Sequence, residues 1–245
     1  RFGDIAAVPV LLNAASDADA DLAQSAKATL TRMEGKPVDA ALLNRLPQAS
    51  GKTRQVIIEL AALRRIEAAV PAIVASAEDP DPGVRRAALG TLSTLGSEHQ
   101  AGGLVRLLSK AQDPADRDAI EAALTAICGR VGTKCLPQVL PLAKNSNSEL
   151  RIIALRALAT MGGRDALAAV TSALEDRDES VQDEAVGTLA TWLNNWPEDA
   201  AVAEPLLGLV KAGKKRSHQV QGARGYLLYV QEDKKLSNAD KLRAI

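Results

Sequence analysis

The sequence predicts an all-α fold, a right-handed α-solenoid of about seven consecutive helix pairs, on three observations. Ala and Leu, with 45 and 33 residues, make up about a third of the 245 residues and are strong helix formers. Aromatic residues, which favour strands, number only five. A leucine with similar surroundings recurs at intervals of 30 to 38 residues, and a polar turn divides each interval into two apolar segments.

The recurring leucine belongs to an amphipathic pattern. In residues 84–95, apolar side chains at Val84, Ala88, Leu89, Leu92 and Leu95 share one face of a helix. A helix pair with one apolar face cannot bury that face alone, whereas stacked pairs can, so we expect one continuous array. The seven recurring positions are Leu30, Leu60, Leu92, Leu124, Leu158, Leu189 and Leu227.

Each predicted repeat consists of a first helix, a polar turn and a second helix. Asp, Asn and Ser in the turns can accept hydrogen bonds from the free N–H groups of a helix start, and Gly96 and Gly162 are placed for left-handed caps. A further helix start at 237–240 and the absence of an initiator Met suggest a piece of a longer protein, or a processed form. We place the repeats in a single array over 1–245, at residues 5–36, 37–67, 68–99, 100–134, 135–165, 166–200 and 201–245.

Charge and composition weigh against several function classes. Basic and acidic residues balance at 30 each, whereas proteins that follow a phosphate backbone usually carry a basic excess. No run of 18 apolar residues is present, so we expect no membrane insertion. We also expect no metal and no cofactor, because two cysteines alone cannot form a metal site and His99 and His218 each lie far from them in sequence.

Two groups of basic residues are candidate sites. Arg85, Arg117 and Arg151 recur once per repeat, four residues after Asp81, Asp113 and Asn147. They could bind an acidic peptide or phosphate, but we favour pairing with the Asp or Asn of the turn, which would join one repeat to the next. The other group is Lys211, Lys214, Lys215, Arg216 and His218, which we interpret as a solvated loop rather than a phosphate site.

The cysteines and the aromatic residues are the remaining candidates. Cys128 ends one predicted helix and Cys135 begins the next, so a disulfide is possible in an exported protein, the alternative being two buried thiols. The aromatic residues lie close together near the C-terminus. With an arginine they could form a stacking surface for a partner or a following domain, or they could fill the wider last repeat. The residues are Trp192, Trp196, Arg224, Tyr226 and Tyr229.

The repeated order Asp-x-x-x-Arg, then Ala, then Leu resembles the HEAT repeat, in particular the short bacterial variety also seen in bilin-lyase-like proteins. Residues 189–197 and 218–226 resemble the end of HEAT arrays in large exported bacterial proteins that carry sugar-active or c-type cytochrome domains. Those arrays have Asp before the Trp and a Leu-Arg-Gly-Tyr run, whereas here Asn195 precedes Trp196 and Ala223 precedes Arg224. No Cys-x-x-Cys-His is present, so a haem would lie outside this chain. The resemblance implies an exported or periplasmic location.

The function that this resemblance implies is a non-catalytic protein-interaction or spacer scaffold, whose partner is a protein or an adjacent domain of the same polypeptide. One alternative is a nucleic-acid-binding HEAT module of the DNA-glycosylase type, against which neutral charge and the scarcity of aromatic residues count. The other is a bilin-lyase-like enzyme, for which no reactive residue stands out. Common catalytic motifs such as Gly-x-Ser-x-Gly and His-Glu-x-x-His are absent from the sequence.

Overall fold

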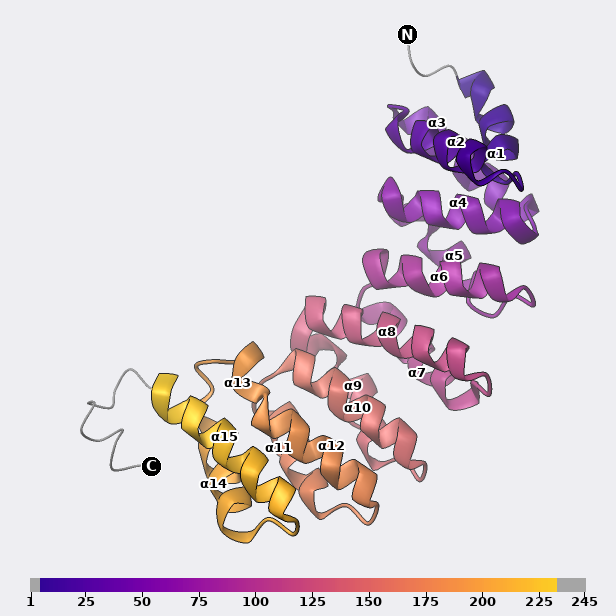
Figure 1. The fold of residues 1–245 in the computed structure, drawn as a ribbon. Coiled ribbons are helices and arrows are strands. Elements are labelled where there is room, and N and C mark those ends of the chain that lie inside the picture. The colour runs from indigo at the N-terminus through magenta and orange to yellow at the C-terminus, as the bar shows by residue number, and fades with distance from the viewer. Residues whose placement is uncertain (1–4, 233–245) are drawn as a thin grey trace. The chain divides into compact units, whose positions relative to one another are not determined.

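The computed structural model describes residues 5–232, which form helices and turns without any strand (Figure 1). This confirms the predicted all-α fold. Contacts group the chain into two compact units, residues 1–127 and 128–245. Helix α8 (Pro114–Val131) begins in the first unit and ends in the second.

In the first unit, the second helices of successive pairs lie side by side, and α4 packs against both α2 and α6 (Figure 1). Short 3₁₀ segments, η1 to η3, precede or extend the first helices. The pairs are α1 (Val8–Ala15) with α2 (Ala20–Arg32), α3 (Lys36–Arg45) with α4 (Gly51–Leu63), α5 (Val70–Ser76) with α6 (Pro82–Leu95), and α7 (Glu98–Lys110) with α8; the 3₁₀ segments are Ile5–Ala7, Leu46–Gln48 and Glu67–Ala69.

The second unit repeats this arrangement, with α12 between α10 and α15. Together with the first unit this gives seven helix pairs within residues 5–232, while the helix start predicted at 237–240 lies outside the described residues. The elements are η4 (Gly132–Cys135), α9 (Leu136–Val139) and η5 (Leu142–Lys144) before α10 (Ser148–Met161); α11 (Arg164–Ser172) and η6 (Ala173–Glu175) before α12 (Glu179–Ala190); and α13 (Trp192–Asn195), η7 (Ala200–Val202) and α14 (Ala203–Ala212) before α15 (Arg216–Glu232).

The predicted leucine positions form the core, with one correction. Leu30, Leu60, Leu92, Leu124, Leu158 and Leu189 are all at most 2% exposed. Leu227 is only partly buried, and the equivalent position in α15 is Tyr226, one residue earlier. The buried residues His218, Gly222 and Gly225 of α15 correspond to Val181, Ala185 and Thr188 of α12. The connection between α12 and α14 contains the extra helix α13, and this insertion shifts the spacing.

Capping residues begin the second helices as predicted. The side chains of Asp19, Asp81, Asn147 and Asp178 accept hydrogen bonds from backbone N–H groups at the starts of α2, α6, α10 and α12. Gly162 ends α10 with a φ of +64° and a ψ of −168°, a conformation that favours glycine but is not the left-handed helical cap that was predicted. Gly96 ends α6 with a φ of −64°, so the left-handed cap predicted there was wrong. Its lack of a side chain makes space, since a Cβ would lie 2.6 Å from Ile127 Cδ1.

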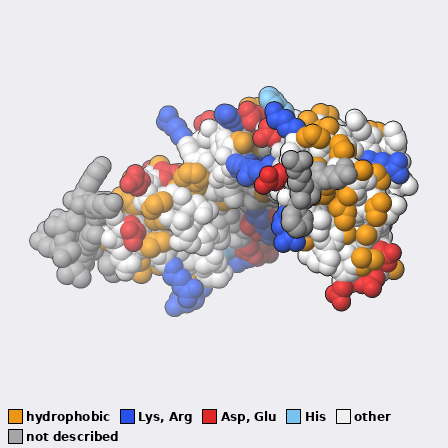
Figure 2. Space-filling model, turned by 90° about the horizontal axis from the view of Figure 1, so that it is seen from above, with side chains coloured by type: hydrophobic (Ala, Val, Ile, Leu, Met, Phe, Trp, Pro, Cys, Tyr) orange, Lys and Arg blue, Asp and Glu red, His pale blue; other side chains and the backbone are white. Residues whose placement is uncertain are grey.

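The surface carries charges of both signs, and apolar side chains gather over the N-terminal helices (Figure 2). Ile5, Val10 and Leu22 are exposed there, with Val10 69% exposed. None of the helices within residues 5–232 combines the length and the apolarity needed to cross a membrane.

Candidate functional site

Arg151 joins its own turn to the next repeat. Its guanidinium donates to the carbonyl oxygens of Asn145 (2.8 Å) and Ser146 (3.1 Å), which precede α10. It also forms a two-point contact with Asp176, Nε to Oδ2 at 2.9 Å and Nη2 to Oδ1 at 2.8 Å. The Arg151 side chain is only 5% exposed. Paired contacts of this kind are geometrically specific, so Arg151 fixes where the turn before α12 lies against α10.

Arg85 has the same role in α6. It donates to the carbonyl oxygens of Asp79 and Pro80, both at 3.0 Å, and pairs with Asp116 of α8 at 2.7 Å. The structure therefore confirms that these arginines join repeats. The expected partners Asp81 and Asn147, four residues ahead of the arginines, instead cap their own helices. The guanidinium binds a carboxylate of the following repeat.

The arginine column, defined by Arg85, Arg117 and Arg151, also includes Arg54 and Gln182. Arg54 of α4 pairs with Asp79 at 3.2 Å. Arg117 donates to the Ala111 carbonyl oxygen at 3.0 Å. Gln182 of α12 donates to the Asp176 carbonyl oxygen at its own turn. A long polar side chain bound to a carbonyl of its own turn is thus common to Arg85, Arg117, Arg151 and Gln182, whereas Arg54 contacts Ser76 and Asp79 of the following repeat.

Asp176 serves both its own turn and the preceding repeat. Its Oδ1 accepts a hydrogen bond from the Asp178 N–H at 2.9 Å, in addition to the bonds from Arg151. Burial alone would raise the pKa of Asp176, but the hydrogen bonds from Arg151 and the Asp178 N–H bring that pKa below its usual value. The carboxylate is therefore held in its charged form in the folded protein.

The two tryptophans pack within the second unit. Trp192 is 1% exposed, and its indole N–H donates to Asp199 Oδ2 at 2.9 Å. Trp196 donates to the Ala159 carbonyl oxygen at 2.8 Å, near the end of α10. Its ring lies directly against Gly162, where a Cβ would be 2.3 Å from ring carbon Cε2. Helix α13 therefore connects α12 to α10 through its aromatic side chains.

The other three predicted contact residues lie on α15, but not on one face. Tyr226 and Tyr229 are partly buried, with ring centroids 6.0 Å apart and ring planes at 37°. They lie on the same side of the helix as the buried residues Gly222 and Gly225. Arg224 is exposed on the opposite side. The structure thus places the tyrosines at the edge of the core and leaves Arg224 facing outward.

Two members of the basic cluster, Lys215 and His218, pair with α12, whereas Lys211 and Arg216 are exposed, as predicted for a solvated loop. Lys215 lies 2.7 Å from Asp183 and 2.5 Å from Glu179. His218 is 3% exposed, and its Nε2 is 2.6 Å from Asp183 Oδ1. Hydrogen bonds from Lys215 and His218 lower the pKa of Asp183. A run of basic residues looks solvated in sequence because the acidic partners lie more than 30 residues earlier.

Neither cysteine forms a disulfide, and both side chains are fully buried. They share a side-chain hydrogen bond, and burial raises the pKa of Cys128 well above that of an exposed thiol. The predicted proximity of Cys128 and Cys135 is therefore present, with both thiols reduced in this structure. Within residues 5–232 no group of three His, Cys, Asp or Glu side chains has an arrangement that would hold a metal ion.

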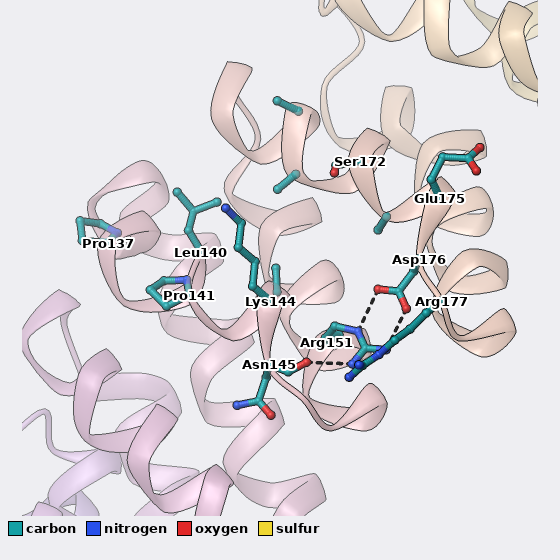
Figure 3. Close-up of a pocket in the computed structure, with 14 residues that line it drawn as sticks. Pro137, Leu140, Pro141, Lys144, Asn145, Arg151, Ser172, Glu175, Asp176 and Arg177 are labelled. Atoms are coloured by element: carbon teal, nitrogen blue, oxygen red, sulfur yellow. Dashed lines mark hydrogen bonds and ion pairs between the residues drawn. The ribbon is translucent and has the colours of Figure 1, made fainter.

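Sequence reasoning missed a groove between the first helical segments of two repeats in the second unit. Pro141 carries no N–H to continue the helix, so α9 ends after one turn. The space beside it has a volume of about 1070 Å³. Figure 3 shows Pro137, Leu140, Pro141 and Lys144 along one side, with Arg151 and Asp176 together at one end. The sequence feature that could have indicated this groove is the pair of prolines, Pro137 and Pro141, which limits the length of α9.

Sequence comparison identifies this repeat. The model of HEAT repeats matches residues 39–125 and 136–217. No curated protein is similar enough to count as a relative. Among solved structures, the chain is similar to the complex of CpcE and CpcF of phycocyanin lyase from Nostoc sp. PCC7120, at 20% identity over 97% of this chain and 91% of that chain, with a TM-score of 0.44.

Two further solved structures show lower sequence identity. An engineered protein is 17% identical over 100% of this chain and 74% of its own, with a TM-score of 0.48. Human deoxyhypusine hydroxylase in complex with glycerol is 14% identical over 98% of this chain and 93% of that chain, with a TM-score of 0.36. The two segments that match the repeat model cover more than half of the sequence, and the chain belongs to the HEAT-repeat family.

Proposed function

We propose that this protein is a non-catalytic interaction scaffold that binds a protein, or a neighbouring domain of the same polypeptide, through the outward face of α15. HEAT repeats commonly mediate protein interactions, so membership of this family supports a scaffold function. The finer assignment to α15 rests on the distribution of apolar and charged side chains along that helix.

The observation that carries the proposal is an exposed apolar and charged side of α15. In α10 and α12, the side toward the following repeat is buried, with Leu155 and Val186 both 1% exposed. No helix follows α15 within residues 5–232. Its corresponding side presents Val220, which is 43% exposed, together with Arg224 and the partly exposed Leu227. Apolar side chains around an arginine are typical of the centre of a protein interface.

The aromatic residues contribute differently to this surface. Tyr226 and Tyr229 offer their exposed edges beside it. Trp192 and Trp196 lie outside the proposed binding surface. They pack α13 against α10 and α15 and so help to position α15.

The charge pattern favours a protein partner over nucleic acid. Lys214, Lys215 and His218 are matched by acidic residues of the second unit, including Glu175 and Asp183. A phosphate backbone would have to compete with these carboxylates. The net charge of zero also gives little counterion release, which supplies most non-specific affinity for nucleic acid.

Photo-crosslinking tests the proposal. A benzophenone amino acid replaces Val220 in the whole protein, and the same replacement at the exposed Arg86 of α6 is the control. We expect a discrete protein adduct from position 220 in an extract of the source organism, and we expect Arg224→Glu to abolish it. An adduct only from position 86, or one from 220 that Arg224→Glu leaves intact, would contradict the proposal. Binding of a labelled 20-nucleotide DNA duplex would support the nucleic-acid alternative instead.

A further inference from the structure

The groove beside α9 is much larger than four other recesses between helices. Its volume is about 1070 Å³, whereas four others range from about 200 to 270 Å³. Proteins bind drug-sized ligands in spaces of about 300–1000 Å³, so this groove has room for several amino-acid residues. It lies between the first helical segments of two repeats, on different elements from the outward face of α15.

The two long walls of the groove are built from side chains that leave its middle empty. One wall is α11 and η6, where Ala168, Ala169, Ser172 and Ala173 present no bulk. The opposite wall contains Pro137 and Pro141 at either end of the short helix α9. Small residues on one side and a shortened helix on the other let a backbone approach closely, as an extended peptide requires.

The groove carries uncompensated positive charge. Its end is occupied by the Arg151–Asp176 pair, in which the charges cancel (Figure 3). Glu175 pairs with Lys214 at 2.8 Å and so does not neutralise the groove. Lys144 is exposed, extends into the groove in Figure 3, and has no ion-pair partner within residues 5–232. Arg177 donates to the Ser146 carbonyl oxygen at 2.9 Å, and its charge helps to lower the pKa of Asp176, so Lys144 is the cation left for a ligand.

We infer that this groove binds an extended segment of a partner protein that places a carboxylate on Lys144 and small apolar side chains against the α11 wall. The charge favours an acidic residue in the occupant, because a neutral or basic segment would leave Lys144 without a counter-charge. Only the residues of the bound segment that face the alanines of α11 must be small. Specificity therefore comes from the acidic residue of the segment and from the small residues next to it.

A displayed library of random dodecapeptides provides the probe. It is selected on the whole wild-type protein and counter-selected on Ala168→Trp, which fills the groove from an exposed position of α11. We expect the recovered peptides to share an Asp or Glu flanked by small apolar residues. One synthetic peptide from this set is then titrated against charge-reversal variants.

Lys144→Glu should weaken binding of that peptide about five- to tenfold, because it converts a favourable surface contact into repulsion. The matched control is Lys110→Glu, at an exposed lysine that lines one of the smaller recesses in the first unit, and it should leave the affinity unchanged. A peptide in which Lys replaces the Asp or Glu should bind the Lys144→Glu protein again, because the charges of the pair are then exchanged. Thermal melting of each variant shows that folding is intact.

Two results would overturn the inference. The first is recovery of the same peptides on wild type and on Ala168→Trp. The second is equal binding by Lys144→Glu and Lys110→Glu. Neither result bears on the crosslink from Val220, so failure of the groove and failure of the α15 surface are distinguishable.

Discussion

At Gly162, the absence of a side chain lets the Trp196 ring lie against the end of α10. The backbone has a φ of +64°, which costs other residues about 1–2 kcal/mol. A Cβ at this position would also meet the ring at 2.3 Å. We therefore expect Gly162→Ala to lower the free energy of unfolding by at least about 2 kcal/mol, from both effects together.

A double-mutant cycle separates the two effects. In a Trp196→Ala background the clash is gone, so the cost of Gly162→Ala should fall to about 1–2 kcal/mol, the cost of backbone strain alone. Urea unfolding of the four proteins measures the difference. Equal costs in both backgrounds would show that the ring does not lie against Gly162.

At the scale of elements, Arg151 and Asp176 connect α10 to the turn before α12. Asp176→Asn would leave the guanidinium, which is 5% exposed, without a compensating charge. We expect a loss of about 3 kcal/mol in unfolding free energy, because two carbonyl oxygens still accept from Arg151. The control is Glu184→Gln, which removes the partner of Arg156, itself 49% exposed. That change should cost less than about 1 kcal/mol. Denaturant unfolding in which both variants lose the same amount would argue against this connection.

Cys128 and Cys135 link the end of α8 to η4. Because both thiols are buried against each other, we expect them to form a disulfide when the protein is made under oxidising conditions. Thiol titration of unfolded, unreduced protein from such a preparation should then find almost no free thiol. Two free thiols per chain would show that the pair stays reduced. Cys135→Ser, which leaves a single thiol, calibrates the assay.

Local features of the elements were predictable from sequence, and contacts between elements were not. Asp81 and Asn147 cap helices that begin at the next residue, so the sequence pattern alone indicated their role. The carboxylate that binds Arg151 lies 25 residues later, and the repeat pattern did not single it out. Trp192 and Trp196 look alike in sequence, but only the fold decides that the first fills the core. The groove could not be predicted, because it depends on the size of the side chains on α11 and η6 that face the shortened helix α9.

At the scale of the whole molecule, three carboxylates of the second unit have lowered pKa values. The pKa values of Asp176, Asp178 and Asp183 are all below the usual value of about 3.9. A carboxyl whose pKa is lowered by folding contributes stability above its unfolded pKa and loses that contribution as the pH falls through the folded value. Stability should therefore decline below about pH 4.

Melting temperatures between pH 7 and pH 3 test this expectation. The wild type should lose more stability across that range than Asp183→Asn, which has one such carboxyl fewer. The same pH dependence in both proteins would show that Asp183 contributes nothing to acid sensitivity.

Arg54, Arg85 and Arg151 each belong to an earlier repeat, and the carboxylate partner of each belongs to the following one. As a ribosome releases the chain, the N-terminal part of a protein can fold first. Arg85 and Arg151 can then be oriented by the carbonyl oxygens of their own turns before the carboxylate has been synthesised. During synthesis, the last folded repeat therefore presents an oriented guanidinium that can bind the carboxylate of the next repeat. Repeats can then pack onto the array in the order in which they are translated.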